Sequence, residues 1–258
     1  MADKRGGRVI GKALRKVDAV AKVTGATKFA DDLAFPRMLY CKLLRSTQPH
    51  ARIASIDASG ALEQPGVQAV LTGQDLPIPF GILPGSQDDH ALCVAKVRFI
   101  GDAVAAVAAT SEEAATAALD FIKVVYEPLK SFASAEEAVE HPEPRIHDYG
   151  DTGNLHKLID LEFGDAAQGI AEGDIVREDL FFFEGNTHLP MEQHAAVATW
   201  SPDGKVTLWS STQTPHYVHR ALAKVLELPR ARIRVIATPN GGGFGGKSDP
   251  FNHEIAVA

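Results

Sequence analysis

The chain has 258 residues, of which 45% are hydrophobic and 23% charged, and this composition excludes a disordered or collagen-like protein. Lysine and arginine number 26 against 33 aspartates and glutamates, so the net charge is −7, and no basic run suggests a nucleic-acid partner. The longest apolar segments, such as 103–109, are far shorter than the roughly 20 residues of a transmembrane helix. No apolar segment typical of a signal peptide follows the first residues. We therefore expect a cytoplasmic protein.

The two cysteines, Cys41 and Cys93, stand alone, and neither belongs to a Cys-x-x-Cys pair. Isolated cysteines are typical of a reducing compartment. A 2Fe-2S cluster needs four cysteine ligands, or two cysteines and two histidines. We therefore expect that this chain holds no iron-sulfur cluster by itself.

Short apolar segments and turn residues organise the first part of the chain. Strands are predicted at 39–44 and 67–71, with one short helix at 58–64 between them. The segment 74–90 is rich in proline and glycine, which predicts an irregular surface loop with a covering or binding role.

A β-α-β unit is predicted next. Residues 103–109 have the pattern of a buried strand, and 112–119 that of a helix. Thr110 and Glu113 match a Thr-x-x-Glu capping box at the start of this helix. Residues 121–126 return as a strand that ends before Pro128.

From 131 to 151 the composition shifts toward glutamate, histidine and proline, and periodicity fades. We place a domain boundary in this stretch. The expected organisation is a first domain at 1–135, a linker at 136–170 and the start of a second domain at 171–258.

Local signals are clear in the second domain. They predict a long strand at 175–183 and a hairpin of strands 196–200 and 205–209 around Ser201-Pro202-Asp203-Gly204. A helix follows, with Thr214 as its cap and Pro215 in its first position, and it ends at Leu228-Pro229. A strand is predicted at 231–237. Residues 250–258 have the pattern of a helix start without a residue that ends it, so we expect the chain to be a fragment.

A glycine-rich segment, Pro239-Asn240-Gly241-Gly242-Gly243-Phe244-Gly245-Gly246-Lys247-Ser248, follows the last strand. Its uncovered backbone N–H groups would let an anionic or flat ligand approach closely. A flexible loop is the alternative, and Phe244 argues against a simple linker.

The segment also fits both G-x-x-x-x-G-K-S and G-x-G-x-x-G. Pro250 disfavours the helix that a P-loop requires, and neither a Walker-B carboxylate nor the Rossmann acidic residue has room in the ten residues after Ser248.

Two polar segments precede the glycine-rich one. Residues 184–194 contain His188 and His194, which are six positions apart, whereas histidine pairs that bind metal on a helix are usually four apart. Structural hydrogen bonding is therefore favoured over metal binding. Gln213 follows a predicted strand, where it could donate to a ligand oxygen or close the turn.

Together these segments resemble the large, molybdopterin-binding subunit of the molybdenum hydroxylases, the xanthine dehydrogenase and aldehyde oxidoreductase family. The resemblance is carried by Pro190-Met191-Glu192, Ser211-Thr212-Gln213-Thr214-Pro215, Gly241–Lys247, Gly11–Ala19, Lys22–Gly25, Phe29–Asp32, Arg45-Ser46 with His50-Ala51, and Phe99–Asp102. It covers nearly the whole chain. The resemblance implies an α+β fold, with an N-terminal α/β hammerhead-like domain followed by the first part of a molybdopterin-binding α+β domain.

The resemblance also implies roles for individual residues. Gln213 would hydrogen-bond the apical oxygen ligand of molybdenum, and Gly243, Phe244 and Gly245 would contact the metal centre and the pterin. In the family the metal is held by cofactor sulfurs, so no protein ligand to the metal is expected. The family's glutamate base lies farther toward the C-terminus, so no catalytic residue is expected in this chain.

Partners and substrate follow from the same resemblance. The cofactor would be molybdopterin with molybdenum, in its cytosine dinucleotide form. An iron-sulfur small subunit would hold 2Fe-2S clusters and a medium subunit would bind FAD. The three subunits would form a dimer of heterotrimers.

Ser248 stands where xanthine-oxidising members carry glutamate. Residues 184–190 and 248–254 are most similar to the 4-hydroxybenzoyl-CoA reductases, so reductive dehydroxylation of 4-hydroxybenzoyl-CoA to benzoyl-CoA is expected. Hydroxylation of an aldehyde or N-heteroaromatic compound, a P-loop-like nucleotide-binding module, and a mere folding or docking unit are the alternatives.

Overall fold

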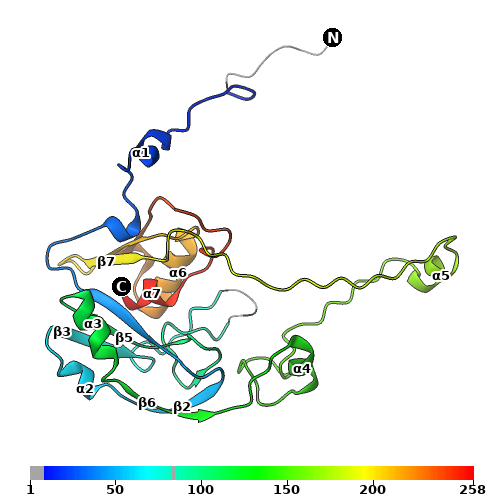
Figure 1. Ribbon diagram of the computed structural model, residues 1–258, viewed down its shortest axis with the longest axis horizontal. Coiled ribbons are helices and arrows are strands. Elements are labelled where there is room, and N and C mark those ends of the chain that lie inside the picture. The colour runs from blue at the N-terminus through cyan, green and yellow to red at the C-terminus, as the bar shows by residue number, and fades with distance from the viewer. Residues whose placement is uncertain (1–8, 83–84, 86) are drawn as a thin grey trace.

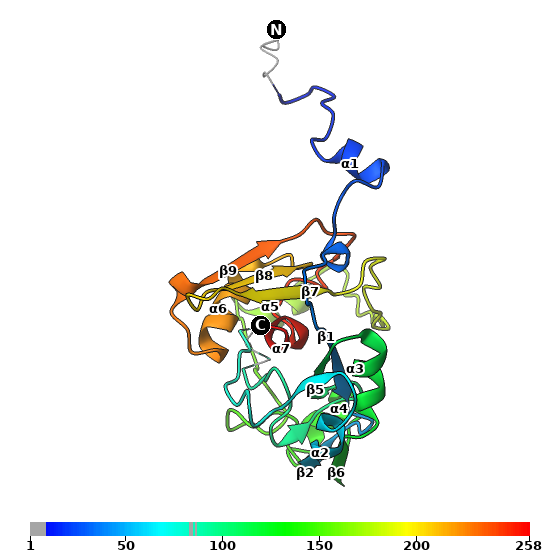
Figure 2. The same cartoon turned by 90° about the vertical axis from the view of Figure 1, so that its left-hand side faces the viewer.

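The computed structural model describes residues 9–82, 85 and 87–258. Two packed units of strands and helices lie beside each other, and a long extended segment that carries helix α5 (Ala166–Ala171) leaves them and returns (Figure 1). The N-terminal segment with α1 (Ala19–Val23) projects away from both units (Figure 2), whereas the 3-10 turn η1 (Ala30–Asp32) contacts β7. The mixed architecture confirms the predicted α+β class.

The first unit contains two three-stranded antiparallel sheets, with strand orders β1-β5-β3 and β4-β2-β6. The strands are β1 (Tyr40–Arg45), β2 (Ala51–Asp57), β3 (Val67–Thr72), β4 (Lys96–Val97), β5 (Ala103–Ala109) and β6 (Lys123–Pro128). Helix α3 (Glu112–Leu119) packs on β1 and β5, and α2 (Ser59–Leu62) packs on β3. Ala105 and Val107 of β5 share an apolar cluster with Ala118 of α3, whereas Val104 faces a second cluster. Successive residues of a strand point to opposite faces, so both faces of β5 are buried.

The predicted elements of this unit are found within one or two residues, but the β-α-β interpretation is wrong. Strands β5 and β6 belong to different sheets, and each pairs antiparallel with its neighbours. Helix α3 therefore connects two sheets. Its cap is also one residue later than predicted, because the Ser111 hydroxyl accepts the Ala114 N–H at 3.1 Å. Ser111 is the N-cap, so the Thr110–Glu113 capping box is not formed.

The second unit is a three-stranded sheet in the order β7-β8-β9, with β7 (Ala196–Trp200), β8 (Val206–Ser210) and β9 (Ile233–Ala237). The predicted hairpin is confirmed as the antiparallel pair β7–β8. Helix α6 (Pro215–Val225) has Thr214 at its N-cap position and proline in its first turn, as predicted, but the Thr214 hydroxyl makes no cap hydrogen bond. The 3-10 turn η3 (Arg230–Arg232) leads into β9. Because β9 pairs parallel with β8, the crossover of this chain is β8-α6-β9.

The core of the second unit lies between its sheet and α6 together with α7 (Asn252–Ala256). It contains the helix residues Val218 and Leu222, the strand residues Val206 and Leu208, and Ile255 of α7. The spacing of Val218, Leu222 and Val225 places them on one helix face, as predicted.

Apolar residues from the first half of the chain join the units. Phe80 and Ala91, from the segment before β4, are buried in the core of the second unit. Phe35 of the N-terminal segment packs against Trp209 of β8 with ring centroids 5.0 Å apart. The predicted loop 74–90 thus has a covering role where it is described, while residues 83, 84 and 86 lie outside the described residues.

The predicted strand 175–183 is wrong. This part of the chain is extended but pairs with no strand of the three sheets, and its apolar side chains, including Phe181, Phe182 and Phe183, are exposed. A strand forms only where a neighbouring strand takes its backbone hydrogen bonds, and no described segment lies there. Helix α4 (Ala135–Glu140) precedes this extended region. Among the described helices, none is long and apolar enough to cross a membrane.

Candidate functional site

The glycine-rich segment forms a tight loop between β9 and α7. Gly242 and Gly245 have φ angles of 114° and 88°, and Phe244 has a φ angle of 52°. The Gly246 N–H donates to the Gly243 carbonyl at 2.7 Å, and the Ser248 N–H donates to the Gly245 carbonyl at 3.2 Å. A left-handed phenylalanine is uncommon and costs free energy, and such residues gather at functional sites. The Phe244 side chain is 74% exposed.

The glycines of this loop, which carry no side chains, make room for the two polar segments that precede it in the sequence. A Cβ atom on Gly243 would lie 2.5 Å from the Gln213 carboxamide carbon, and one on Gly241 would lie 2.6 Å from Cβ of Glu192. One on Gly246 would lie 2.8 Å from Cγ of His188. The three segments singled out in the sequence therefore meet at one place.

Gln213 lies just after β8 and is tied to the end of the loop. Its backbone N–H donates to the Lys247 carbonyl at 2.8 Å. Its side-chain Oε1 accepts the Lys247 N–H at 3.3 Å and the Ser248 hydroxyl at 3.2 Å. No acceptor among the described residues pairs with the Gln213 Nε2, so this amide group is free to donate to a ligand.

Lys247 and Glu192 form a buried ion pair beneath the loop. Lys247 Nζ lies 2.6 Å from Glu192 Oε2, and the two side chains are 0% and 12% exposed. The same Oε2 accepts the Gly241 N–H at 2.7 Å, so one carboxylate oxygen holds both ends of the loop.

This pairing argues against the P-loop alternative. The lysine of a P-loop reaches the phosphates of its nucleotide. Here the Lys247 ammonium is turned away from solvent onto Glu192. The next helix, α7, begins only at Asn252, so the lysine and serine do not open a helix.

Of the two histidines in the first polar segment, His194 is held by contacts with the rest of the protein, whereas His188 is exposed. His194 Nε2 lies 2.9 Å from the Gly246 carbonyl, and its ring packs on Phe251 at a centroid distance of 4.6 Å. In the described parts of the chain, no group of three or more His, Cys, Asp and Glu side chains could hold a metal ion.

Buried polar atoms around the loop remain without partners. They include Glu192 Oε1, Asn240 Oδ1, Thr214 Oγ1 and Asp249 Oδ1. A buried acceptor without a hydrogen bond costs free energy, and a ligand with N–H donors could satisfy it. The exposed backbone of the loop and these acceptors fit a flat, polar, anionic cofactor such as a pterin.

Behind the loop, burial shifts the titration of residues in and beside α7. Burial raises the pKa of Glu254 to about 7, although Ser210 and the Phe251 N–H hydrogen-bond its carboxylate. Burial lowers the pKa of His253 to about 3. Burial also raises the pKa of Asp249. Sequence reasoning missed the Ser210–Glu254 contact, because the two residues belong to different predicted elements.

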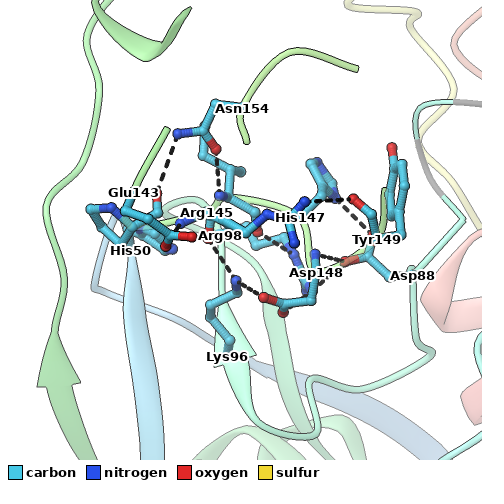
Figure 3. Close-up of polar contacts among 12 residues, drawn as sticks. His50, Asp88, Lys96, Arg98, Glu143, Arg145, His147, Asp148, Tyr149 and Asn154 are labelled. Carbon is cyan, nitrogen blue, oxygen red and sulfur yellow. Dashed lines mark hydrogen bonds and ion pairs between the residues drawn. The ribbon is translucent and has the colours of Figure 1, made fainter. Parts of the chain in front are cut away.

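A second cluster of charged residues joins β4 to the segment 141–156 (Figure 3). Lys96 Nζ donates to the Arg145 carbonyl at 2.7 Å and to the Asp148 carboxylate at 2.8 Å. Arg98 pairs with Asp88 at 2.6 Å, and His147 Nδ1 lies 2.7 Å from the same carboxylate. Carboxylates and main-chain carbonyls thus take up the charges of this cluster, which fastens the acidic segment to the first unit. No local pattern in the sequence marks this cluster.

Comparison with known proteins agrees with this geometry. The model of the molybdopterin cofactor-binding domain matches residues 146–258, and that of the a/b hammerhead domain of aldehyde oxidase and xanthine dehydrogenase matches residues 24–130. The chain belongs to the aldehyde oxidase and xanthine dehydrogenase family. This is a family of molybdenum-containing oxidoreductases, and its matched members are dehydrogenases and oxidases.

Two relatives and two solved structures illustrate the similarity. The nicotinate dehydrogenase large molybdopterin subunit of Eubacterium barkeri is 43% identical over 94% of this chain and 56% of its own. The xanthine dehydrogenase molybdenum-binding subunit of Escherichia coli O157:H7 is 35% identical over 94% of this chain and 33% of its own. Quinoline 2-oxidoreductase from Pseudomonas putida 86 superposes with a TM-score of 0.87 at 31% identity, over 96% of this chain and 32% of its own. The aldehyde oxidoreductase of Desulfovibrio gigas gives a TM-score of 0.83 at 31% identity, over 94% of this chain and 28% of its own.

These matches confirm the hammerhead domain followed by molybdopterin-binding sequence. The chain spans about half the length of the nicotinate dehydrogenase subunit and about a third of the xanthine dehydrogenase subunit and of quinoline 2-oxidoreductase. The domain limits 1–135, 136–170 and 171–258 stay predictions, as do the roles of Gln213, Gly243, Phe244 and Gly245.

Proposed function

We propose that this chain supplies one wall of a molybdopterin site in an oxidoreductase that acts on an aromatic substrate. One observation carries the proposal: the glycine-rich loop brings Gln213, Glu192 and His188 together and leaves N–H donors and unpartnered acceptors around a bare backbone. The cofactor, when bound, would supply a redox-active molybdenum that exchanges electrons with the substrate.

The residues of the chain would bind and orient that cofactor. The Gln213 Nε2 would donate to a cofactor oxygen, because its Oε1 is already engaged by Lys247 and Ser248. Gly243, Phe244 and Gly245 would present the main chain and one exposed ring to the metal and the pterin. No protein ligand to the metal and no catalytic residue of this chain are part of the proposal.

An N-heteroaromatic ring is the first candidate substrate, and the reaction would be its hydroxylation. The 43% identity to a nicotinate dehydrogenase subunit and the superposition on quinoline 2-oxidoreductase support it. Among such rings Ser248 disfavours a purine, since its hydroxyl is engaged by Gln213 and offers no carboxylate.

Reductive dehydroxylation of 4-hydroxybenzoyl-CoA is the second candidate. The segments 184–190 and 248–254 favour it through their resemblance to that reductase. Within either proposal, the cofactor is the cytosine dinucleotide form, and an iron-sulfur small subunit and an FAD-binding medium subunit complete a dimer of heterotrimers. We propose the cytoplasm as location, since Cys41 and Cys93 are free.

Metal analysis and a substrate panel test these proposals. The complex that contains this chain is purified, its molybdenum is measured, and nicotinate, quinoline, xanthine and 4-hydroxybenzoyl-CoA are offered with a dye that accepts or donates electrons. We expect molybdenum and turnover of nicotinate or quinoline, but not of xanthine. Turnover of 4-hydroxybenzoyl-CoA alone would favour the second candidate, and an active complex without molybdenum would contradict both.

A further inference from the structure

The orientation of the Gln213 carboxamide decides what this residue can offer to a ligand. A carboxamide has an acceptor end and a donor end of nearly equal shape, and its hydrogen-bond partners determine which way it faces. The Lys247 carbonyl accepts a hydrogen bond from the Gln213 backbone N–H and fixes the backbone there. The Gln213 side chain, in contrast, borders Gly243, which has no side chain to hold it.

Two donors from neighbouring residues meet the acceptor end. The Lys247 N–H and the Ser248 hydroxyl both donate to Oε1, at 3.3 and 3.2 Å. If the carboxamide were flipped, its NH₂ group would face the Lys247 N–H, and two donors would oppose each other. The flipped state is therefore disfavoured, and Nε2 remains directed away from residues 247–248.

The position of Lys247 in turn depends on Glu192. The Lys247 side chain is wholly buried, and its ammonium pairs with Glu192 Oε2. That oxygen also accepts the Gly241 N–H, so it ties the start of the loop to its end. Glycine-rich backbone has many accessible conformations, and this shared oxygen restricts them.

We propose that the Glu192–Lys247 ion pair and the Ser248 hydroxyl are positioning elements that hold the Gln213 carboxamide with its NH₂ group toward the bound cofactor. This inference rests on the proposed function only in naming the cofactor as the recipient of the hydrogen bond. Ser248 touches Gln213 directly, whereas Glu192 acts through Lys247.

Ser248 variants in the purified complex test the orientation. Ser248→Ala removes one of the two donors, and Ser248→Thr retains a hydroxyl. We expect the Ser248→Ala complex to keep its molybdenum and to show a changed electron paramagnetic resonance signal of the reduced metal. Its kcat should fall by about tenfold, which corresponds to the loss of about one hydrogen bond, and its KM should change less. Ser248→Thr should restore both signal and rate.

Glu192→Gln tests the ion pair with a readout that does not require the cofactor. Hydrogen exchange is measured in complex from molybdenum-depleted cells. We expect amides of residues 241–248 to exchange about tenfold faster than in the unaltered protein, since a hydrogen bond to a charged group is weakened. Asp203→Asn, which breaks the exposed pair of Asp203 with Lys205, is the matched control and should leave this exchange unchanged.

The outcomes separate this inference from the proposed function. Suppose that the unaltered complex contains molybdenum, that Ser248→Ala has the signal and kcat of the unaltered complex, and that Glu192→Gln has its exchange rates. That result would overturn this inference and leave the proposed function standing. Active complex without molybdenum would overturn the proposed function, and faster exchange in Glu192→Gln would still support the role of the ion pair in the loop.

Discussion

Lys96 and Lys247 are both buried and both pair with carboxylates, and their surroundings differ. Lys96 is 6% exposed and contacts both a main-chain carbonyl and Asp148, whose side chain is 62% exposed. Lys247 is fully buried, and its partner Glu192 is nearly so. The first pair fastens one segment to a sheet. The second holds a loop whose glycines leave the backbone bare and whose neighbouring acceptors lack partners.

The difference shows how a similar interaction can have two purposes. A buried charge needs a partner wherever it occurs. At Lys96 the partners belong to the segment that is being fastened, and the carboxylate still reaches water. At Lys247 the ion pair faces away from solvent, so its consequence is the shape of the loop above it. Substitutions at the two sites should therefore have different readouts.

Lys247→Ala should have the largest effect. It leaves the Glu192 carboxylate buried without a counter-ion, and breaking such a pair typically costs about 3–5 kcal/mol. We expect a lower free energy of unfolding for the second unit and loss of molybdenum, measured by denaturant titration and metal analysis of the complex. Normal stability with full molybdenum content would contradict a role of this ion pair in shaping the loop.

The buried carboxyl group of Glu254, behind the same loop, should make the stability of the second unit depend on pH. Burial raises its pKa from 4.5 to about 7, so the folded state keeps a proton that the unfolded state loses. Its contribution is full below pH 4.5 and is lost as the pH rises to about 7, with a total on the order of 3 kcal/mol. Glu254→Gln should remove this loss in unfolding titrations.

His253 has the opposite sign and provides the internal control. Its pKa falls from 6.5 to about 3, so its contribution to stability grows from pH 3 to pH 6.5. The Glu254→Gln variant should therefore become more stable over that range. If stability rose no more steeply between pH 4.5 and 6.5 in Glu254→Gln than in the unaltered protein, the assignment to Glu254 would be contradicted.

Lys96→Ala should be milder than Lys247→Ala. It removes two hydrogen bonds but leaves an exposed Asp148, so a cost of about 1–3 kcal/mol is expected. The effect should appear as faster hydrogen exchange in segment 141–156, with the molybdenum content unchanged. Loss of molybdenum in this variant would mean that the charged cluster of the first unit also shapes the cofactor site.

Gly245→Ala should have the smallest effect on stability. A Cβ atom there meets nothing closer than 3.9 Å, so the cost is only that of a left-handed alanine, about 1–2 kcal/mol. Gly169→Ala in α5, where φ is not positive and no atom lies within 4 Å, is the control and should be neutral or stabilising. Thermal unfolding of the two variants measures the difference.

Features that depend on neighbouring residues could be predicted from the sequence. The hairpin β7–β8 follows from Pro202, Asp203 and Gly204, and helix α6 from Pro215 and its apolar face. The glycine-rich loop was evident as well, because five of its six residues at 241–246 are glycine. These signals lie within a few residues of the structure that they specify.

Features that depend on distant residues could not be predicted from the sequence. The strand expected at 175–183 lacks a partner among the described strands. The sequence pattern predicts β5 and β6 in one β-α-β unit, but they belong to different sheets, because strand pairing is not encoded locally. Glu192 and Lys247 both stand in recognisable motifs, but their pairing across 55 positions became visible only in the fold. Lys96 and Asp148 are separated by 52 positions, and nothing local marks either.

The molybdenum content of a Gly243→Ala variant tests the central claim most directly. Gly243 has no positive φ, so an added methyl group acts through space, where it would lie 2.5 Å from the Gln213 carboxamide. With Gly169→Ala as control, both complexes are purified and their molybdenum per chain is measured. We expect the metal to be lost in Gly243→Ala and retained in the control. Full molybdenum in both would contradict a cofactor site at this loop.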